Sequence, residues 1–202
     1  GQCTGKQPAN SVMVCYGGDG TLLEGVHRLC GAPIPVMGIN AGHLGFLTSA
    51  PSAGLNLIFK EIAEGRLTTE ARSMIEVTGD YAEQPDTTLA LNEFTVQRHG
   101  AGMISVETYV DDQMVATYHG DGVIFSTPTG STAYSLSAGG PVVAPTCACL
   151  VISPLAPHNL TMRPVVIPDT AVITLHVHTR RSDAFVTQDN RVYAVGQEAT
   201  FN

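Results

Sequence analysis

The sequence predicts an N-terminal α/β domain followed by a β-rich domain. Over residues 1–65, short apolar runs alternate with helix-like runs, a pattern typical of βαβ units around a parallel sheet. From residue 66 onward the chain carries only short strand-like runs separated by turn signals. The 202 residues are 44% hydrophobic and 14% charged, so the chain can bury a substantial core. We therefore expect domains at residues 1–65 and 66–202.

The first strand and helix flank a glycine-rich turn. Val12–Cys15 is an apolar run that predicts a buried strand, and Leu22–Cys30 has helical spacing. Between them lie Gly17, Gly18, Asp19, Gly20 and Thr21. Glycine lets the backbone approach a ligand closely, and a helix N-terminus behind such a turn attracts phosphate. The turn predicts a phosphate site, in which Asp19 either carries a proton, orients a metal or caps the helix.

A second strand and helix repeat this arrangement. Val36–Ile39 predicts a strand and is followed by another turn-rich stretch, residues 40–46. The apolar spacing at residues 55–62 predicts a helix that begins near Pro51-Ser52 and ends at Gly65. Strand, helix, strand and helix form a Rossmann-like α/β unit, in which ligands bind at the C-terminal ends of the strands. Both glycine turns follow such ends.

The second part of the chain reads as a series of short strands. We expect them at residues 74–78, 89–97, 103–110, 114–118, 123–126, 150–153, 165–167, 172–178 and 184–187. Two stretches there carry polar groups suited to a ligand. Asn92-Glu93 lies inside the apolar run of residues 89–97, where each side chain needs a hydrogen-bond partner. Residues 120–141 are dense in hydroxyls and glycines and predict a ligand-wrapping loop that leads into a helix.

Charge and cysteine content exclude several functions. The net charge is −8 and Arg180-Arg181 is the only basic pair, so a nucleic-acid partner is not expected. No apolar run reaches the ~20 residues of a membrane helix, and no signal sequence opens the chain. Five cysteines at this density indicate reduced thiols in a cytoplasmic protein. A structural zinc needs about four ligands. The sequence offers only pairs, His176/His178 and Cys147/Cys149, so a zinc site is not expected.

Five stretches carry a family resemblance when taken in chain order. They are residues 17–21, residues 38–48, Leu91-Asn92-Glu93, residues 121–141, and residues 154–160 with Arg163-Pro164. Over residues 12–189 this set resembles the NAD kinases (ATP–NAD kinase family), bacterial ones in particular. Lipid kinases and phosphofructokinases carry close variants of the first motif, whereas the Ser126–Gly140 run and the ordered set are specific.

The resemblance implies transfer of the ATP γ-phosphate to the 2′-hydroxyl of the adenosine ribose of NAD, which yields NADP. It implies that Asp19 is the general base, because a carboxylate in hydrogen-bond reach accepts the proton of a weakly acidic alcohol. Gly17, Gly18, Gly20 and Thr21 would line the phosphates. Mg²⁺ would arrive with ATP and would not be held by fixed protein ligands.

The resemblance also implies that NAD lies in the crevice between the two domains, in a homodimer or homotetramer whose neighbouring subunit completes the site. Asn92 and Glu93 would hold ribose hydroxyls, Phe46 would border the adenine, and Asp121 would bind the nicotinamide side. Asp19 and Gly20 would also touch NAD. The wall of the adenosine pocket would be formed by Ser126, Thr129, Thr132, Ala133 and Tyr134.

The chain also departs from the family pattern, which keeps two alternatives open. Residues 1–10 do not resemble the α/β sequence that precedes the first motif in relatives, and the chain ends early, so the α/β domain is expected to be incomplete. His119 stands where many relatives have a basic residue, and Asp189-Asn190-Arg191 differs from the usual triplet. The alternatives are a catalytically silent NAD(P)-binding module and a lipid or sugar kinase with the same phosphate turn.

Overall fold

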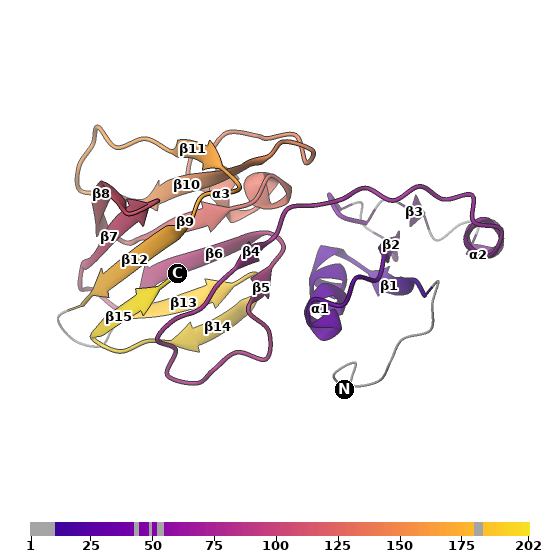
Figure 1. Cartoon of the computed structure of the whole chain (residues 1–202), viewed down its shortest axis with the longest axis horizontal. Coiled ribbons are helices and arrows are strands. Elements are labelled where there is room, and N and C mark those ends of the chain that lie inside the picture. Colours follow the sequence, from indigo (N-terminus) through magenta and orange to yellow (C-terminus); the bar gives the residue numbers. More distant parts are fainter. Residues whose placement is uncertain (1–10, 43–44, 49, 52–54, 180–183) are drawn as a thin grey trace. The chain divides into compact units, whose positions relative to one another are not determined.

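The structure, a computed structural model, describes residues 11–42, 45–48, 50–51, 55–179 and 184–202. It comprises two compact units, residues 1–71 and residues 72–202, which are drawn in Figure 1. The first is a small α/β unit and the second is rich in β-strands, so the predicted fold class is confirmed. His43 and Leu44 of the second glycine stretch, Cys3 and Arg180-Arg181 lie outside the described residues.

The α/β unit is built on a parallel sheet. Cys15 lies opposite Gly38 in the first strand pair, and Ile39 lies opposite Ala50 in the second, both parallel. Ile39 is 1% exposed, and Leu22 and Leu23 are also buried, so the helix after the first strand contributes to the core. The order of elements is β1 (Met13–Gly17), α1 (Asp19–Leu29), β2 (Val36–Asn40), β3 (Ala50–Pro51) and α2 (Leu55–Ala63).

Helix α1 begins three residues earlier than the apolar spacing predicts. Gly18 is extended at φ −95° and ψ −171°, and its carbonyl accepts the N–H groups of Thr21 and Leu22. Asp19, Gly20 and Thr21 therefore form the first turn of the helix. Apolar periodicity could not detect this turn because its residues are small or polar. At the other end Cys30 adopts the left-handed conformation, at φ 47°, and ends the helix.

The β-rich unit contains more strands than the sequence predicts. The strand expected over residues 89–97 is interrupted at Leu91-Asn92, and the strands at 191–194 and 198–201 were not predicted. The bounds are β4 (Ile75–Glu76), β5 (Leu89–Ala90), β6 (Glu93–Arg98), β7 (Ile104–Val110), β8 (Gln113–Gly120), β9 (Gly122–Ser126), η1 (Thr129–Thr132), α3 (Tyr134–Ser137), β10 (Cys149–Leu155), β11 (Val165–Pro168), β12 (Ile173–His178), β13 (Ala184–Gln188), β14 (Arg191–Ala194) and β15 (Glu198–Phe201).

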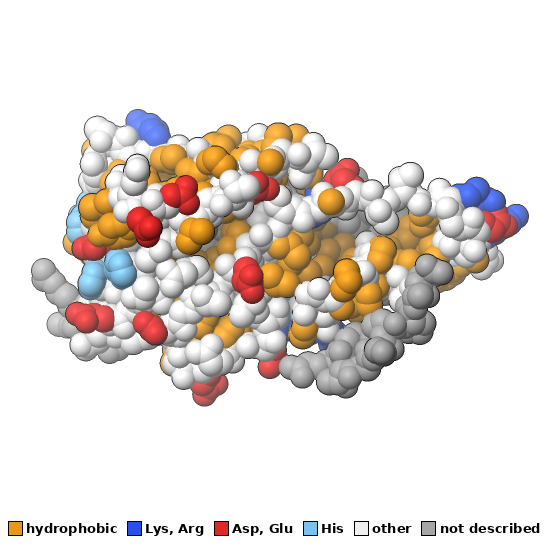
Figure 2. All heavy atoms as spheres, viewed as in Figure 1, with side chains coloured by type: hydrophobic (Ala, Val, Ile, Leu, Met, Phe, Trp, Pro, Cys, Tyr) orange, Lys and Arg blue, Asp and Glu red, His pale blue; other side chains and the backbone are white. Residues whose placement is uncertain are grey.

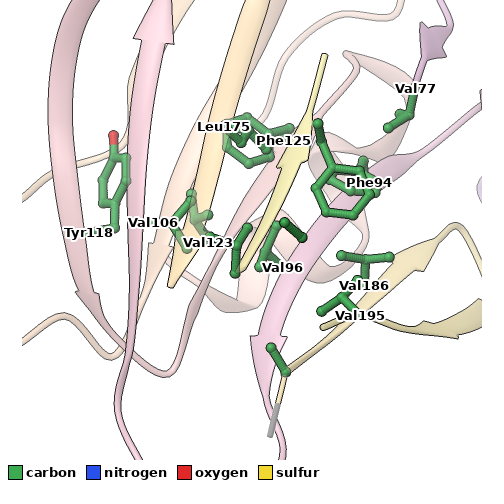
Figure 3. Packing of buried hydrophobic residues seen from close by; sticks show 14 of the residues in the cluster. Val77, Phe94, Val96, Val106, Tyr118, Val123, Phe125, Leu175, Val186 and Val195 are labelled. Carbon is green, nitrogen blue, oxygen red and sulfur yellow. The ribbon is translucent and has the colours of Figure 1, made fainter. Parts of the chain in front are cut away.

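Two antiparallel sheets form the core of this unit. One has six strands in the order β11-β10-β9-β6-β13-β14, and the other has four in the order β15-β12-β7-β8. Alternate residues of both sheets meet in one apolar cluster, in which Phe94, Phe125 and Leu175 lie close together (Figure 3). Val96, Val106 and many of their neighbours are fully buried there. This core gives the loops that follow β6 and β9 a rigid base.

The opposite face of the six-stranded sheet is polar. Because side chains alternate along a strand, Glu93, Thr95 and Gln97 of β6 point away from the apolar cluster. The short elements η1 and α3 lie against this face, since Ser135 Oγ is 3.0 Å from Ser153 Oγ of β10. The predicted ligand-wrapping loop thus covers a polar sheet face.

The described surface is acidic in character. Acidic side chains are dispersed over the face of the β-rich unit that Figure 2 shows. Within the described ranges, no helix is long and apolar enough to cross a membrane. The four cysteines that the structure describes (Cys15, Cys30, Cys147 and Cys149) are free thiols.

Candidate functional site

The glycine-rich turn presents open backbone at the start of α1. Strand β1 ends at Gly17, and α1 begins at Asp19. Gly18 and Gly20 are exposed, and a Cβ atom built on either would meet no described atom within 4 Å. A ligand can therefore approach the N–H groups of the first helical turn, where the helix dipole favours an anion.

The Asp19 carboxylate binds a second segment of the α/β unit and does not cap the helix. Oδ2 accepts the N–H of Phe46 at 2.9 Å, and Oδ1 accepts the N–H groups of Leu47 and Thr48 at 3.0 and 3.2 Å. A Cβ on residue 45 would lie 2.1 Å from Asp19 Oδ1, so glycine at this position lets the carboxylate reach these N–H groups without displacement. The phenyl ring of Phe46 is left 79% exposed. The structure thus brings Asp19 and Phe46 together at the turn.

Asn92 and Glu93 lie at a bend between β5 and β6. Asp189, in the turn after β13, creates this bend: its Oδ1 accepts the N–H groups of Asn92 at 2.7 Å and Glu93 at 3.2 Å, and its Oδ2 accepts that of Leu91 at 3.0 Å. Asp189 itself has a left-handed backbone at φ 52°, and its N–H donates to the Glu93 carbonyl at 2.9 Å. One buried carboxylate therefore replaces a strand partner here, which explains why the predicted continuous strand was wrong.

Two buried oxygens at this bend have no hydrogen-bond partner among the described atoms. They are Asn92 Oδ1 and Glu93 Oε2, on residues that are 9% and 8% exposed. Leaving such groups unpaired is costly, so their persistence favours a ligand that pairs with them. Burial, with a smaller contribution from the Asp189 charge, raises the pKa of Glu93 to about 8. At neutral pH Glu93 is therefore mostly a neutral acid, able both to donate and to accept.

The segment after β9 packs directly on this bend. The N–H of Thr127 donates to the Asn92 carbonyl at 2.9 Å, and the Thr127 hydroxyl donates to the Leu91 carbonyl at 2.6 Å. The same hydroxyl accepts the N–H of Gly130 at 3.1 Å and so ties η1 to the bend. Ser126 lies opposite Glu93 in the β6–β9 pair and is fully buried.

The remaining wall residues extend from the bend along η1 and α3. Thr129 is buried, and its hydroxyl accepts a hydrogen bond from Arg72 at 3.3 Å. Thr132 and Ala133 are half-buried, and the side chain of Tyr134 is 40% exposed with its hydroxyl 3.3 Å from Gln97 Oε1. Ser126 thus lies beside the Asn92-Glu93 bend, whereas the Tyr134 hydroxyl lies at the Gln97 end of β6.

Replacing Gly130 with alanine should disturb this bend, because the new Cβ would lie 2.1 Å from the Asn92 carbonyl oxygen. We expect the free energy of unfolding, measured in urea, to fall by roughly 1 to 3 kcal/mol, since a backbone clash of this size forces the bend to move. The matched control is Gly102→Ala, where a Cβ meets no described atom within 4 Å. Equal stability of the two variants would contradict the prediction.

Asp121 lies at the far end of β9 from the Asn92-Glu93 bend, where Gln97 pairs with Gly122. It precedes β9, whereas Ser126 ends that strand, so the two are separated by about 16 Å along the chain. The Asp121 carboxylate instead accepts a hydrogen bond from Arg98 Nε at 2.6 Å, and this contact raises the pKa of the guanidinium. The pair is partly exposed.

Two residues that shape the bend were missed in the sequence. Asp189 and Thr127 act through long-range contacts, and Asp189 lies almost 100 residues from the bend it holds. The only local signal was Asp189-Asn190, a turn pair after an apolar strand. Among the side chains that the structure describes, no group of three or more His, Cys, Asp or Glu is arranged to hold a metal ion.

The chain thus combines an α/β unit, with a glycine-rich turn at the start of α1, and a sandwich of two antiparallel sheets with a buried polar bend. Family models agree with both units: residues 6–67 match the ATP-NAD kinase N-terminal domain and residues 91–199 match the ATP-NAD kinase C-terminal domain. The chain belongs to the ATP–NAD kinase family.

Bacterial relatives support the same assignment. The chain is 42% identical over 180 residues to an NAD kinase of Porphyromonas gingivalis. The aligned region covers 89% of this chain and 62% of that protein. It is 40% identical over 191 residues to an NAD kinase of Flavobacterium johnsoniae, covering 93% and 65%. The chain thus spans less than two thirds of the length of these relatives.

Two solved structures share the fold. Yeast NADH kinase complexed with NADH has a TM-score of 0.82 at 28% identity, with 94% of this chain and 57% of that one covered. An NAD kinase from Archaeoglobus fulgidus in complex with ATP has a TM-score of 0.79 at 33% identity, with 97% and 77% covered.

Proposed function

We propose that this chain carries the substrate site of an NAD kinase, which transfers the ATP γ-phosphate to the 2′-hydroxyl of the adenosine ribose of NAD. The observation that carries this proposal is that Asn92 Oδ1 and Glu93 Oε2 are buried and have no hydrogen-bond partner in the part of the chain that the structure describes. A ribose offers vicinal hydroxyls that both donate and accept, which suits an amide oxygen beside a neutral carboxylic acid. The names of the relatives and the ATP and NADH bound to the structural neighbours support the choice of substrates.

In this proposal the glycine-rich turn handles phosphate. Gly17, Gly18, Gly20 and Thr21 line the transferred phosphate, and Asp19 and Gly20 also touch NAD. The 2′-oxygen of the ribose forms a bond to the γ-phosphorus, and the bond between the γ-phosphorus and the oxygen that bridges to the β-phosphate breaks. Asp19 accepts the proton that the 2′-hydroxyl loses. Mg²⁺ bound to ATP neutralises phosphate charge.

The other predicted residues bind NAD. Asn92 and Glu93 hold the ribose hydroxyls, and Phe46, whose ring is exposed, borders the adenine. The adenosine wall comprises Ser126, Thr129, Thr132, Ala133 and Tyr134. Asp121, at the other end of β9 from Ser126, binds the nicotinamide side. A neighbouring subunit of a homodimer or homotetramer completes the site, and the free thiols support a cytoplasmic location.

Two other functions are distinguished by experiment and by structure. A catalytically silent NAD(P)-binding module would bind NAD without forming NADP. A lipid or sugar kinase fits the phosphate turn taken alone, but an acyl chain would leave Asn92 Oδ1 and Glu93 Oε2 unpaired.

The proposal is tested by incubating the chain with NAD, ATP and Mg²⁺ and measuring NADP by chromatography. We expect NADP to form in proportion to ADP, with NADH and polyphosphate run in parallel as alternative acceptor and donor. If NAD binds but no NADP forms with either donor, the silent module is the correct function. If NAD does not bind at all, the NAD kinase proposal is wrong.

A further inference from the structure

A chain of hydrogen bonds crosses the polar face of the six-stranded sheet and ends at Tyr134. The Tyr134 hydroxyl donates to Gln97 Oε1 at 3.3 Å, and Gln97 Nε2 donates to Thr95 Oγ1 at 2.7 Å. Thr95 Oγ1 lies 2.7 Å from Thr187 Oγ1 on the adjacent strand β13. The chain therefore connects a fully buried hydroxyl, on Thr95, to a side chain that is 40% exposed, on Tyr134.

Gln97 has no role in the phosphate or ribose contacts proposed above. It lies near the C-terminal end of β6, four residues after Glu93, and alternation places Glu93, Thr95 and Gln97 on one face of the sheet. Glu93 and Gln97 are thus the two ends of a polar strip, Glu93-Thr95-Gln97, that runs beneath η1 and α3. The ribose would be held at the Glu93 end, and the Gln97 end faces Tyr134.

The short helix that contains Tyr134 does not hold its side chain in one conformation, so the hydrogen bond to Gln97 serves this purpose. Helix α3 is only four residues long, from Tyr134 to Ser137, and Tyr134 is its first residue. A side chain at this position on a single helical turn has two free torsions, and ordering it on ligand binding costs conformational entropy. The bond to an amide that is itself held by Thr95 removes part of that cost before the ligand arrives.

We propose that Gln97 is a positioning residue for nucleotide binding: it fixes the Tyr134 ring as the aromatic wall of the adenosine pocket. This inference rests on the proposed NAD site. Gln97 acts through Tyr134 and does not touch the ligand, so its removal weakens NAD binding without slowing phosphate transfer. The effect of Gln97 also disappears when Tyr134 can no longer donate its hydrogen bond.

A double-mutant cycle tests both statements. Gln97→Met keeps the length of the side chain and removes the amide, and Tyr134→Phe keeps the ring and removes the hydroxyl. We expect each single variant to raise the Kd and KM for NAD about threefold to tenfold with kcat unchanged. The double variant should be no weaker than the single variants, because both remove the same bond. Gln97→Glu, which keeps an acceptor for the Tyr134 hydroxyl, should recover most of the affinity.

The matched control is Gln113→Met at the exposed start of β8 in the other sheet, which should leave NAD affinity unchanged. Thermal unfolding of every variant separates a loss of folding from a loss of binding. The inference is overturned if Gln97→Met binds NAD as tightly as the wild type. It is also overturned if Gln97→Met lowers NAD affinity by the same factor in the Tyr134→Phe protein as in the wild type. A wild-type chain that does not bind NAD overturns the proposed function together with this inference, whereas NAD binding that is insensitive to Gln97 overturns this inference alone.

Discussion

Replacing Asp19 with asparagine is expected to lower the rate of NADP formation by about two to four orders of magnitude. An amide has the shape of the carboxylate but cannot accept the proton of the ribose hydroxyl. NAD binding should persist, because the buried oxygens of Asn92 and Glu93 are unchanged. The measurements are kcat from initial rates and NAD affinity from calorimetry. A variant with a near-wild-type rate would exclude Asp19 as the base.

The contacts of Asp19 require a control for local structure. Its carboxylate oxygens together accept the N–H groups of Phe46, Leu47 and Thr48, and an amide would turn its NH₂ group toward one of these donors. Thr48→Val weakens the same junction by removing the Thr48 hydroxyl, 3.4 Å from Asp19 Oδ1, and leaves the carboxylate in place. We expect it to lose less than tenfold in rate. A loss as large as that of Asp19→Asn would show that the junction, and not the base, is responsible. Glu24→Gln, at an exposed ion pair on α1, is the neutral surface control.

Elements with strong local periodicity were predictable from the sequence. Val36–Asn40 and Ile104–Val110 carry apolar runs or alternation that identify a strand without reference to the rest of the chain. Strands β14 and β15 were missed because they are four residues long and contain charged or small residues, such as Arg191 and Glu198. Their pairing with β13 and β12 stabilises them, and that pairing is not visible locally.

In the candidate site, too, the features set by neighbouring residues were predictable and those set by distant residues were not. The glycines around Asp19 are a local signal, and the turn they predict is observed at the start of α1. The bend at Asn92-Glu93 depends on Asp189, and no property of residues 89–97 alone indicates that a distant carboxylate will take three of their N–H groups. The ion pair of Asp121 with Arg98 is equally invisible, because it forms where two strands meet. The long-range contacts of these two carboxylates therefore could not be predicted from the sequence.

The buried acid at the bend makes the stability of the protein depend on pH. The pKa of Glu93 is raised from 4.5 to about 8, chiefly by burial and also by the neighbouring Asp189 carboxylate. Between these two values the folded state holds a proton that the unfolded state releases. The stabilisation is therefore fully present below about pH 4.5 and is lost as the pH rises through about 8.

Urea unfolding from pH 5 to pH 8.5 should show this loss as a fall of roughly 3 to 5 kcal/mol in the free energy of unfolding. Glu93→Gln, which is neutral at every pH, should remove most of that slope and become the more stable protein at the alkaline end. The control Glu198→Gln changes an exposed carboxylate on β15 and should retain the wild-type slope. If wild type and Glu93→Gln share one pH profile, Glu93 is ionised in the folded protein at neutral pH. The ribose hydroxyls would then meet an acceptor only, and the donor half of the proposed ribose contact would have to come from the amide of Asn92.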